Sequence, residues 1–287
     1  MSFFDLSNKV AVVTGATKGI GRGIVERLAE HGASVVVSSR RQAACDEVAA
    51  ELDEDYGKNC MRIAHGVACD IERLEQIERL AERSAEHFDG IDILVANAAV
   101  LPFVGASRDT PPALFERILT KNLHNSFRLC QAVRPHMARR GGGSIVLIGS
   151  LAGLVPFPTL MAYSIAKAGL AHLARCLADE FAPDGITVNC VSPGSIRTAS
   201  SARSGVDDDN RRSAAVPLQR VGEPDDIAGA VIYLASAAGS YVTGVTLPVD
   251  GGRSQLSPAD RGVPTTHRRL WGTDLNAASG SADESLE

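Results

Sequence analysis

Three residue types between Ser150 and Lys167 could together move a proton to or from a substrate oxygen. Tyr163 and Lys167 stand four positions apart, so they share one face if the segment is helical. A free phenol has a pKa of about 10 and a free ammonium about 10.4, so neither is an effective acid or base at neutral pH. We expect the charge of Lys167 to lower the pKa of Tyr163, and Ser150 to hold a carbonyl oxygen beside the phenol. Such a set would transfer a proton while a hydride moves at the substrate carbon.

A Tyr-x-x-x-Lys pair also arises by chance, so the elements that surround it decide its meaning. The apolar run 9–14 predicts a buried parallel strand, and a glycine-rich turn, a helical pattern and a second strand at 34–38 follow it. This is the context in which a glycine turn binds a dinucleotide, because backbone N–H groups and the helix N-terminus can approach a pyrophosphate. A plain tight connection would use glycines too. The expected cofactor contacts in the turn are Gly15, Thr17, Lys18, Gly19, Ile20 and Gly21.

The end of the second strand indicates which dinucleotide binds. A site that prefers NAD usually places an acid there for the ribose 2′-hydroxyl. This chain has Ser39, Arg40 and Arg41 instead, and no acid before Asp46. Arginine can bind a 2′-phosphate through paired hydrogen bonds, and Lys18 could add a further cation, so the sequence predicts NADP(H). The alternative is that both arginines are solvated residues at the start of a helix.

Strands and helices alternate without internal repeats over most of the chain. Further strands are expected near 61–69, 91–96, 144–148 and 186–191, and further helices at 73–87, at 112–139 and before 181. The alternation predicts an α/β fold, a doubly wound parallel sheet in three αβα layers (Rossmann-like), with 1–252 as a single domain. Residues after strand ends would contact the cofactor, although core packing also explains the small ones. These residues are Asp70 and Ile71, at the adenine, and Asn97, Ala98 and Ala99.

The ordered set of motifs is similar to that of the short-chain dehydrogenase/reductase superfamily, in its compact single-domain subgroup. The matching residues, spread over about 9–252, are Thr14, Gly15, Gly19, Gly21, Asp70, Asn97, Ala98, Ala99, Asn122, Ser150, Tyr163, Lys167, Pro193, Gly194, Thr198, Asp250, Gly251 and Gly252. Any one of these matches is weak, whereas their order along the chain is specific. Ala99 departs from the glycine often found at its position, and its extra methyl beside the cofactor should be tolerated.

The resemblance implies a role for each catalytic residue. Tyr163 would be the general acid in reduction and the general base in oxidation. Lys167 would lower the pKa of Tyr163 and hold the nicotinamide ribose. Ser150 would orient the carbonyl oxygen, and Asn122 would position a water for proton relay. The residues implied at the nicotinamide are Pro193, Gly194, Ile196 and Thr198.

Apolar residues near the expected catalytic group predict the substrate class. A largely apolar site suits a hydrophobic ketone or secondary alcohol, although such residues after a strand can also belong to the core. The residues expected in the substrate pocket are Leu101, Phe103, Leu151 and Phe157. The polar stretch 200–212 is expected to be a lid. Its cations, Arg203, Arg211 and Arg212, are expected on a solvated surface rather than against an acidic substrate.

Composition excludes several classes of function. The chain has 287 residues, 45% of them hydrophobic, and a formal net charge of −5 without a basic block, so nucleic-acid binding is not indicated. No apolar run reaches the roughly 20 residues needed to cross a bilayer, and no signal-peptide layout is present, which favours a cytoplasmic protein without membrane binding. The six cysteines lack metal-ligand spacing, so we expect no metal site and mostly buried thiols.

The stretch 253–287 is rich in Ser, Ala, Pro and charge, and alone it would be disordered. We expect Leu270 and Trp271 to anchor this extension on a neighbouring subunit. The resemblance implies a homotetramer or homodimer, with the helices near 112–139 and 160–181 paired. Leucines that could supply a contact face, or equally pack in the core, are Leu170, Leu173 and Leu177.

The favoured function is therefore an NADP(H)-dependent carbonyl reductase, or secondary-alcohol dehydrogenase in reverse, with a small-molecule substrate. The nearest enzymatic alternative is a 3-oxoacyl-thioester reductase acting on acyl carrier protein or CoA substrates. A carrier protein would need a cationic surface, for which only Arg139 and Arg140 stand out. The non-enzymatic alternative is an NADP-sensing binding protein, which has no evident need of Ser150, Tyr163 and Lys167.

Overall fold

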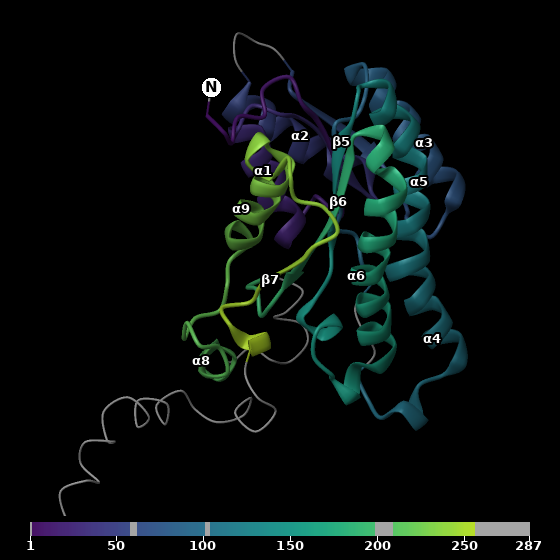
Figure 1. The fold of residues 1–287 in the computed structure, drawn as a ribbon, viewed down its shortest axis with the longest axis vertical. Helices are drawn as coiled ribbons and strands as arrows, with labels where there is room; N and C mark the ends of the chain where they lie inside the picture. Colours follow the sequence, from purple (N-terminus) through teal and green to yellow (C-terminus); the bar gives the residue numbers. More distant parts are fainter. Residues whose placement is uncertain (1, 58–61, 101–103, 199–208, 256–287) are drawn as a thin grey trace, which may run out of the picture.

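A computed structural model describes residues 2–57, 62–100, 104–198 and 209–255. Within these residues, seven strands form one sheet in the order β3-β2-β1-β4-β5-β6-β7, and every neighbouring pair is parallel. Figure 1 shows β5, β6 and β7 with helices on either side of them. The strands are β1 (Val10–Thr14), β2 (Ser34–Ser39), β3 (Ala64–Ala68), β4 (Ile93–Ala96), β5 (Gly143–Ile148), β6 (Ile186–Pro193) and β7 (Thr246–Val249). The predicted doubly wound parallel sheet is confirmed.

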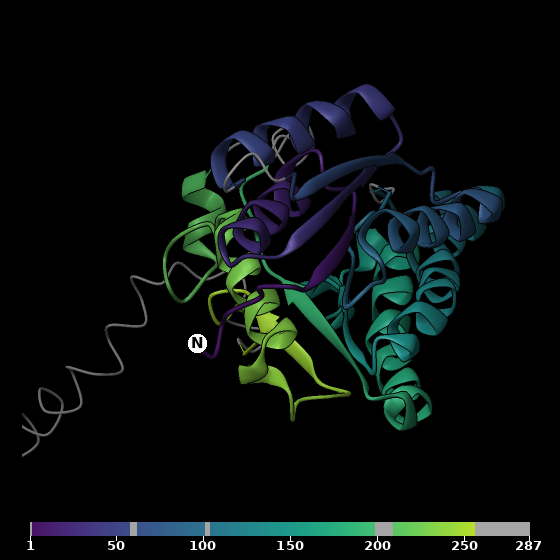
Figure 2. The ribbon, with the colours of Figure 1, turned by 90° about the horizontal axis from the view of Figure 1, so that it is seen from above.

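Helices cover both faces of the sheet (Figure 2). One layer holds α1 (Gly19–Glu30), α2 (Gln42–Tyr56) and α9 (Pro224–Ala235). The other layer holds α3 (Leu74–Phe88), α4 (Pro112–Leu119), α5 (Asn125–Arg139) and α6 (Met161–Phe181), and the short α8 (Asp209–Ala214) follows β6 in the chain. Short 3-10 helices lie at Ser107–Asp109, Leu151–Gly153, Pro158–Leu160, Ala182–Asp184, Ala237–Gly239 and Arg253–Gln255.

The two helical layers bury two separate apolar clusters against the sheet. Because successive strand side chains point to opposite faces, Val13 packs with α1 and α9, whereas its neighbour Val12 packs with α3 and α5. Leu170 and Leu177 of α6 are 1% and 2% exposed and belong to the second cluster. Leu173 packs partly buried against the same cluster. Leu170 and Leu177 therefore pack in the core, and the partly buried Leu173 remains a candidate for a contact face.

The helix predicted to run unbroken over 112–139 is interrupted. A π-helical turn, Thr120–His124, separates α4 from α5. Its Asn122 is 1% exposed, donates from Nδ2 to the Ile118 carbonyl over 3.0 Å, and accepts at Oδ1 from the Val100 N–H over 3.2 Å. Asparagine competes with regular helical hydrogen bonding, and π turns often occur at functional sites. The turn thus ties the chain after β4 to the helix.

The sheet places one crevice at its centre. Strand β1 has β2 on one side and β4 on the other, so the strand order reverses there. In open α/β sheets, ligands bind beyond the carboxyl ends of the strands at such a point. The glycine turn after β1 and residues 97–99 after β4 lie at this crevice.

The predictions about cysteines, the domain boundary and membrane spans can be compared with the structure only over the described residues. Cys45, Cys69, Cys130 and Cys190 are buried, and Cys176 is exposed. The domain boundary at residue 252 stays a prediction, because residues 256–287 lie outside the part that the structure describes. Among the described helices, none is long and apolar enough to span a membrane.

Candidate active site

The glycine turn after β1 has the shape of a phosphate cradle. Gly15 and Gly19 have φ values of +66° and +56°, in the left-handed region that favours glycine. A Cβ at Gly21 would collide with the carbonyl oxygen of Gly15 and with Asn97 Nδ2. Asn97 Nδ2 donates to the carbonyls of Thr14 (2.9 Å) and Gly15 (3.2 Å), which ties β4 to the turn. Since α1 begins at Gly19, its N-terminal N–H groups face the same space, and the site fits a pyrophosphate.

The end of β2 carries cations next to this turn. Thr17 Oγ1 donates to Ser39 Oγ over 3.2 Å, which joins the turn to the strand end. Arg40 and Arg41 are exposed, and so is Lys18, the residue that precedes α1. Among the described residues, no carboxylate forms an ion pair with any of these three cations. Their charges remain available to an anionic ligand.

The adenosine end of the crevice is completed from β3 and β4. Asp70 and Ile71 follow β3, and Asp70 Oδ1 accepts from the Glu72 N–H over 3.1 Å. Ala98 donates its N–H to Thr14 Oγ1 over 3.1 Å. The backbone after β4 therefore lies close to β1. Strand β4 is the direct neighbour of β1 at the point where the strand order reverses, and β2 separates β3 from β1.

The expected catalytic and nicotinamide residues border one cavity of about 270 Å³. Ser150 follows β5, Tyr163 and Lys167 come from α6, and the segment after β6 closes the far wall. A Cβ at Gly19 would lie 3.2 Å from Thr198 Cγ2, so the glycine turn and that segment approach each other across the groove. The lining residues are Ile20, Asn97, Ala99, Ile148, Gly149, Ser150, Tyr163, Lys167, Pro193, Gly194, Ser195, Ile196, Thr198 and Arg212. Asn122, the other residue expected to be catalytic, does not line this cavity.

Two ionisable residues of the cavity, Tyr163 and Lys167, are held by groups from different parts of the chain. Burial raises the pKa of the partly buried Tyr163, and a hydrogen bond with Ser150 opposes that rise. Lys167 Nζ lies 5.7 Å from the Tyr163 ring centroid and donates to the Ile148 carbonyl over 2.6 Å. In this structure the Lys167 ammonium binds a strand-end carbonyl, while burial and Ser150 shift the pKa of Tyr163, so the expected lowering of that pKa by Lys167 stays a prediction.

Burial also changes the lysine itself. Lys167 is 4% exposed, and burial lowers its pKa to about 8, while Cys190 acts in the opposite direction. Because burial raises the pKa of Tyr163, its phenol favours the protonated form, which is the form that can donate a proton.

The residues expected in the substrate pocket do not line this cavity where the structure describes them. Leu101 and Phe103 lie outside the described residues, as does most of the predicted lid. Leu151 is 6% exposed in the 3-10 helix after Ser150, and Phe157 is partly buried. Neither Leu151 nor Phe157 lines the cavity.

Arg212 borders the cavity, although the sequence interpretation expected it on a solvated surface. Its side chain is 12% exposed, lines the cavity, and donates to Asp209 (3.2 Å) and to the Ile196 carbonyl (2.9 Å). The expectation of a solvated surface is thus wrong for Arg212. No spacing in the charge-rich run around it distinguishes this arginine, because its position depends on where α8 packs. Arg203 and the side chain of Arg211 lie outside the described part.

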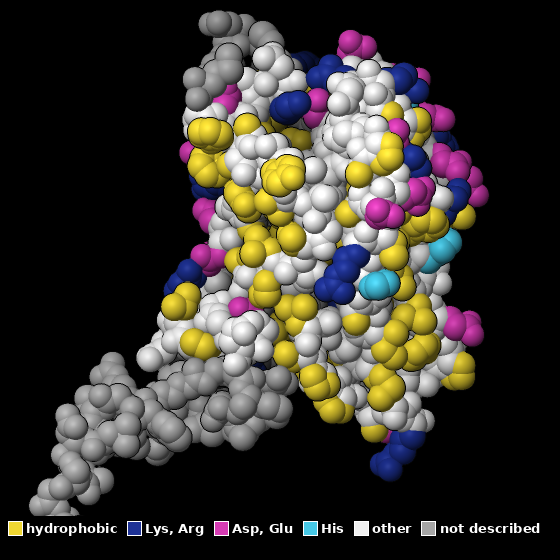
Figure 3. Space-filling model, in the orientation of Figure 1, with side chains coloured by type: hydrophobic (Ala, Val, Ile, Leu, Met, Phe, Trp, Pro, Cys, Tyr) yellow, Lys and Arg dark blue, Asp and Glu magenta, His cyan; other side chains and the backbone are white. Residues whose placement is uncertain are grey.

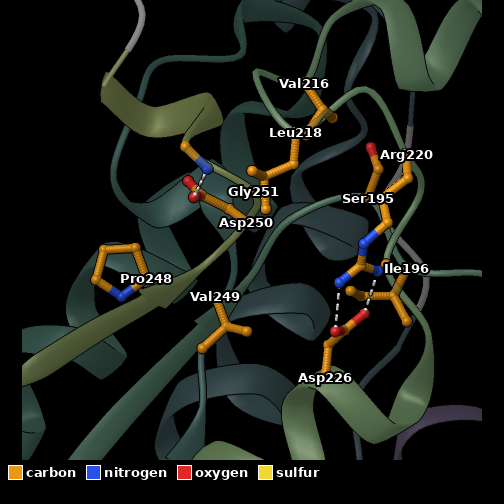
Figure 4. Close-up of a pocket in the computed structure, with 12 residues that line it drawn as sticks. Ser195, Ile196, Val216, Leu218, Arg220, Asp226, Pro248, Val249, Asp250 and Gly251 are labelled. Carbon is orange, nitrogen blue, oxygen red and sulfur yellow. Dashed lines mark hydrogen bonds and ion pairs between the residues drawn. The ribbon is translucent and has the colours of Figure 1, made fainter.

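A second cavity, of about 230 Å³, adjoins the first and shares Ser195 and Ile196 with it (Figure 4). Arg220 and Asp226 form a bidentate ion pair at its side, with N–O distances of 2.6 and 2.7 Å. Asp250 Oδ2 accepts from the Ser254 N–H over 2.7 Å. The Asp-Gly-Gly motif at the end of β7 therefore holds the chain that leaves the sheet. Among the described residues, no group of three His, Cys, Asp or Glu side chains could hold a metal ion.

Comparisons with known proteins agree with this geometry. A family model described as enoyl-(acyl carrier protein) reductase matches residues 15–254. Dehydrogenase/reductase SDR family member 4 of Bos taurus is 42% identical over 249 residues, which cover 86% of this chain and 88% of that protein.

Solved structures extend the similarity to the whole fold. A short-chain type dehydrogenase/reductase from Mycobacterium marinum is 37% identical, with a TM-score of 0.81, covering 88% of this chain and 97% of that one. A 7α-hydroxysteroid dehydrogenase in complex with NADH and 7-oxo glycochenodeoxycholic acid is 34% identical, with a TM-score of 0.80, covering 87% and 95%. The chain therefore belongs to the short-chain dehydrogenase/reductase superfamily, whose members are oxidoreductases that use a nicotinamide cofactor.

Proposed function

We propose that the protein is an NADP(H)-dependent oxidoreductase that interconverts a ketone or aldehyde and the corresponding alcohol. The observation that carries the proposal is that Ser150, Tyr163 and Lys167 border the same cavity as the glycine-turn residue Ile20. A proton donor and a dinucleotide cradle then share one space. Reduction of a carbonyl needs both.

In this mechanism the nicotinamide supplies the hydride when it is bound. Ser150 and Tyr163 hold the substrate oxygen, and Tyr163 donates its phenolic proton to that oxygen as negative charge develops there. Lys167, whose ammonium reaches the Ile148 carbonyl, would hold the nicotinamide ribose. Asn122, fixed by its contacts to Ile118 and Val100, would support the route by which the phenol regains a proton.

The preference for NADP(H) rests on the charges at the end of β2. A 2′-phosphate carries negative charge, and arginine binds such a group through two parallel hydrogen bonds. Arg40 and Arg41 are exposed without a carboxylate partner among the described residues, and Lys18 stands on the neighbouring turn. The 7α-hydroxysteroid dehydrogenase structure contains NADH. The cations at β2 are what favours the phosphorylated form here.

The test is a substrate and cofactor panel. Oxidation of NADPH and of NADH is followed with aliphatic and aromatic ketones, steroid ketones and a β-keto thioester. We expect turnover of a ketone with a higher kcat/KM for NADPH than for NADH. Cofactor binding without turnover of any carbonyl compound would favour the NADP-sensing alternative, and exclusive turnover of the thioester would favour the thioester reductase.

Thioester substrates are the second candidate because the matching family model is described by an acyl-carrier-protein substrate. The two arginines considered for a carrier-protein surface do not support that candidate. Arg140 contacts Asp92 and the Asn8 carbonyl, at the amino ends of the strands, and Arg139 contacts His136. Both therefore lie at the edge of the sheet opposite the catalytic cavity. A ketone stays the favoured substrate class.

We also propose a homodimer or homotetramer. Exposed apolar side chains occur on α6 and around β7, and Figure 3 shows hydrophobic side chains on the surface over α6 and α9. The exposed apolar residues there are Met161, Ile165, Tyr233, Tyr241 and Val245. Light scattering after size exclusion should give two or four times the 30.2 kDa chain mass. A monomer at micromolar concentration would refute the proposal.

A further inference from the structure

Lys121 is a buried cation that the proposed mechanism does not use. It lies in the π-helical turn next to Asn122 and is 2% exposed. Lysine is almost never buried to this extent unless it is paired. Its Nζ forms an ion pair with Glu72, which belongs to the turn that follows β3. The pair thus joins the helical layer to the segment that carries Asp70.

A second contact fixes the same two segments together. Asn125, one helical turn along from Lys121, donates from Nδ2 to the Ile71 carbonyl. Asp70 in turn accepts from the Glu72 N–H, so its carboxylate faces the backbone of the same turn. Two carboxylates, Asp70 and Glu72, therefore stand two residues apart at the adenosine end of the crevice. Lys121 contacts the second of them, Glu72.

The surroundings connect Lys121 with the cations of β2. Burial lowers the pKa of Lys121, the carboxylate of Asp70 opposes that effect, and the guanidinium of Arg40 adds to it. Strands β2 and β3 pair with Ser39 opposite Ala68, so Arg40 and Asp70 follow neighbouring strand ends at the same edge of the sheet. Among the described residues, Glu72 has one other cationic contact, with Arg117 at 3.5 Å. The Arg117 side chain is 62% exposed, so this second ion pair is weak.

We propose that Lys121 determines cofactor specificity by neutralising Glu72 next to Asp70, so that the 2′-phosphate can bind at Arg40. The inference rests on the proposed binding of adenosine between the ends of β2 and β3. Carboxylates at this edge repel a 2′-phosphate for the same reason that an acid at the end of β2 selects the 2′-hydroxyl. A buried ammonium removes that repulsion without occupying the cofactor space. It is therefore a positioned counter-charge and not a direct ligand of the phosphate.

The experiment compares the full-length wild type with Lys121→Met, Glu72→Gln, the double variant and Lys9→Met. Lys9 pairs with Asp92 over 3.3 Å at the amino ends of β1 and β4, so Lys9→Met removes the same charge at the opposite edge of the sheet. Isothermal titration calorimetry gives Kd for NADPH and for NADH at low ionic strength. The readout is the ratio of the two Kd values, since a loss of packing alone weakens both cofactors alike.

We expect Lys121→Met to raise the Kd of NADPH relative to that of NADH by about tenfold. One carboxylate that has lost its ion pair would then repel the phosphate through partly screened surroundings. The double variant should return to within about threefold of wild type, because it removes both members of a neutral pair. Lys9→Met should leave the ratio unchanged. An unchanged ratio in Lys121→Met, or a shift that the double variant retains, overturns the inference.

The result separates this inference from the proposed function. If the wild type binds NADH more tightly than NADPH, the NADP(H) proposal fails. The change in ratio on replacing Lys121 still supports or overturns the role of that lysine, because it is measured relative to the wild type.

Discussion

Replacing Lys167 by methionine should change how the stability of the fold depends on pH. Burial lowers the pKa of this ammonium from 10.5 to about 8 in the folded protein. In the unfolded chain it regains an ordinary value of about 10.4. Between these two values the unfolded state binds more protons than the folded state, so the free energy of unfolding rises with pH. Lys167 therefore destabilises the fold most below pH 8, and this effect fades as pH rises toward 10.

The size of the effect follows from the two pKa values. Their difference corresponds to roughly 3 kcal/mol of destabilisation at pH 7. Raising the pH from 7 to 9.5 should remove about 2 kcal/mol of it, because the folded-state lysine is then neutral while the unfolded-state lysine is still mostly charged. Lys167→Met lacks the group. The wild type should thus gain ~2 kcal/mol of unfolding free energy relative to the variant over this range.

Urea unfolding followed by circular dichroism, at pH 7, 8, 9 and 9.5 with a reductant present, measures this difference. Lys9→Met is the control, since Lys9 has a side chain that is 50% exposed and lies at the other edge of the sheet. The effect specific to Lys167 is the part of the pH-dependent change in unfolding free energy that exceeds the change found with Lys9→Met. Parallel stability curves for the wild type and Lys167→Met would refute the argument, because they would mean that the buried ammonium keeps an ordinary pKa.

Three further predictions concern turnover, cofactor choice and the glycine turn. Tyr163→Phe should lower kcat by about 10²–10⁴-fold with little change in the Kd of NADPH, and full turnover in stopped-flow assays would contradict its role as general acid. Arg40→Asp should move the ratio of kcat/KM values toward NADH, because a carboxylate repels the 2′-phosphate; an unchanged ratio would remove Arg40 from that role. Gly21→Ala should destabilise the protein by about 1–3 kcal/mol in urea unfolding and weaken binding of both cofactors, since its Cβ meets the Gly15 carbonyl. Gly229→Ala is its control, because a Cβ there meets nothing within 4 Å, and equal stability changes in the two variants would exclude the steric explanation.

Local spacing accounts for the predictions that the fold confirms. A strand, a glycine turn and a helix are set by contacts within about thirty residues, so the order of apolar runs and glycines indicates the parallel sheet directly. The four-residue spacing of Tyr163 and Lys167 places both on one side of α6 whatever packs against it. Both residues border the predicted cavity for that reason.

Directions of side chains depend on segments that are distant in the sequence. Whether Lys167 meets Tyr163 or a carbonyl depends on the position of the end of β5, and Ile148 is the group it reaches. The break in the helix near Asn122 follows from a hydrogen bond to Val100, which the helical pattern of 112–139 does not contain. Spacing along one helix cannot predict such contacts.

By itself, the sequence determined the class of fold, the cradle for a dinucleotide and the residue types available for proton transfer, because each of these follows from short-range pattern. Only the tertiary structure decided which charges are buried and what they face. Lys121 against Glu72, and Arg212 against Ile196, have no signal in the chain, since burial is a property of the packed layers. Burial sets the pKa of Tyr163 and of Lys167 through the loss of water around each group, which no spacing of residues records.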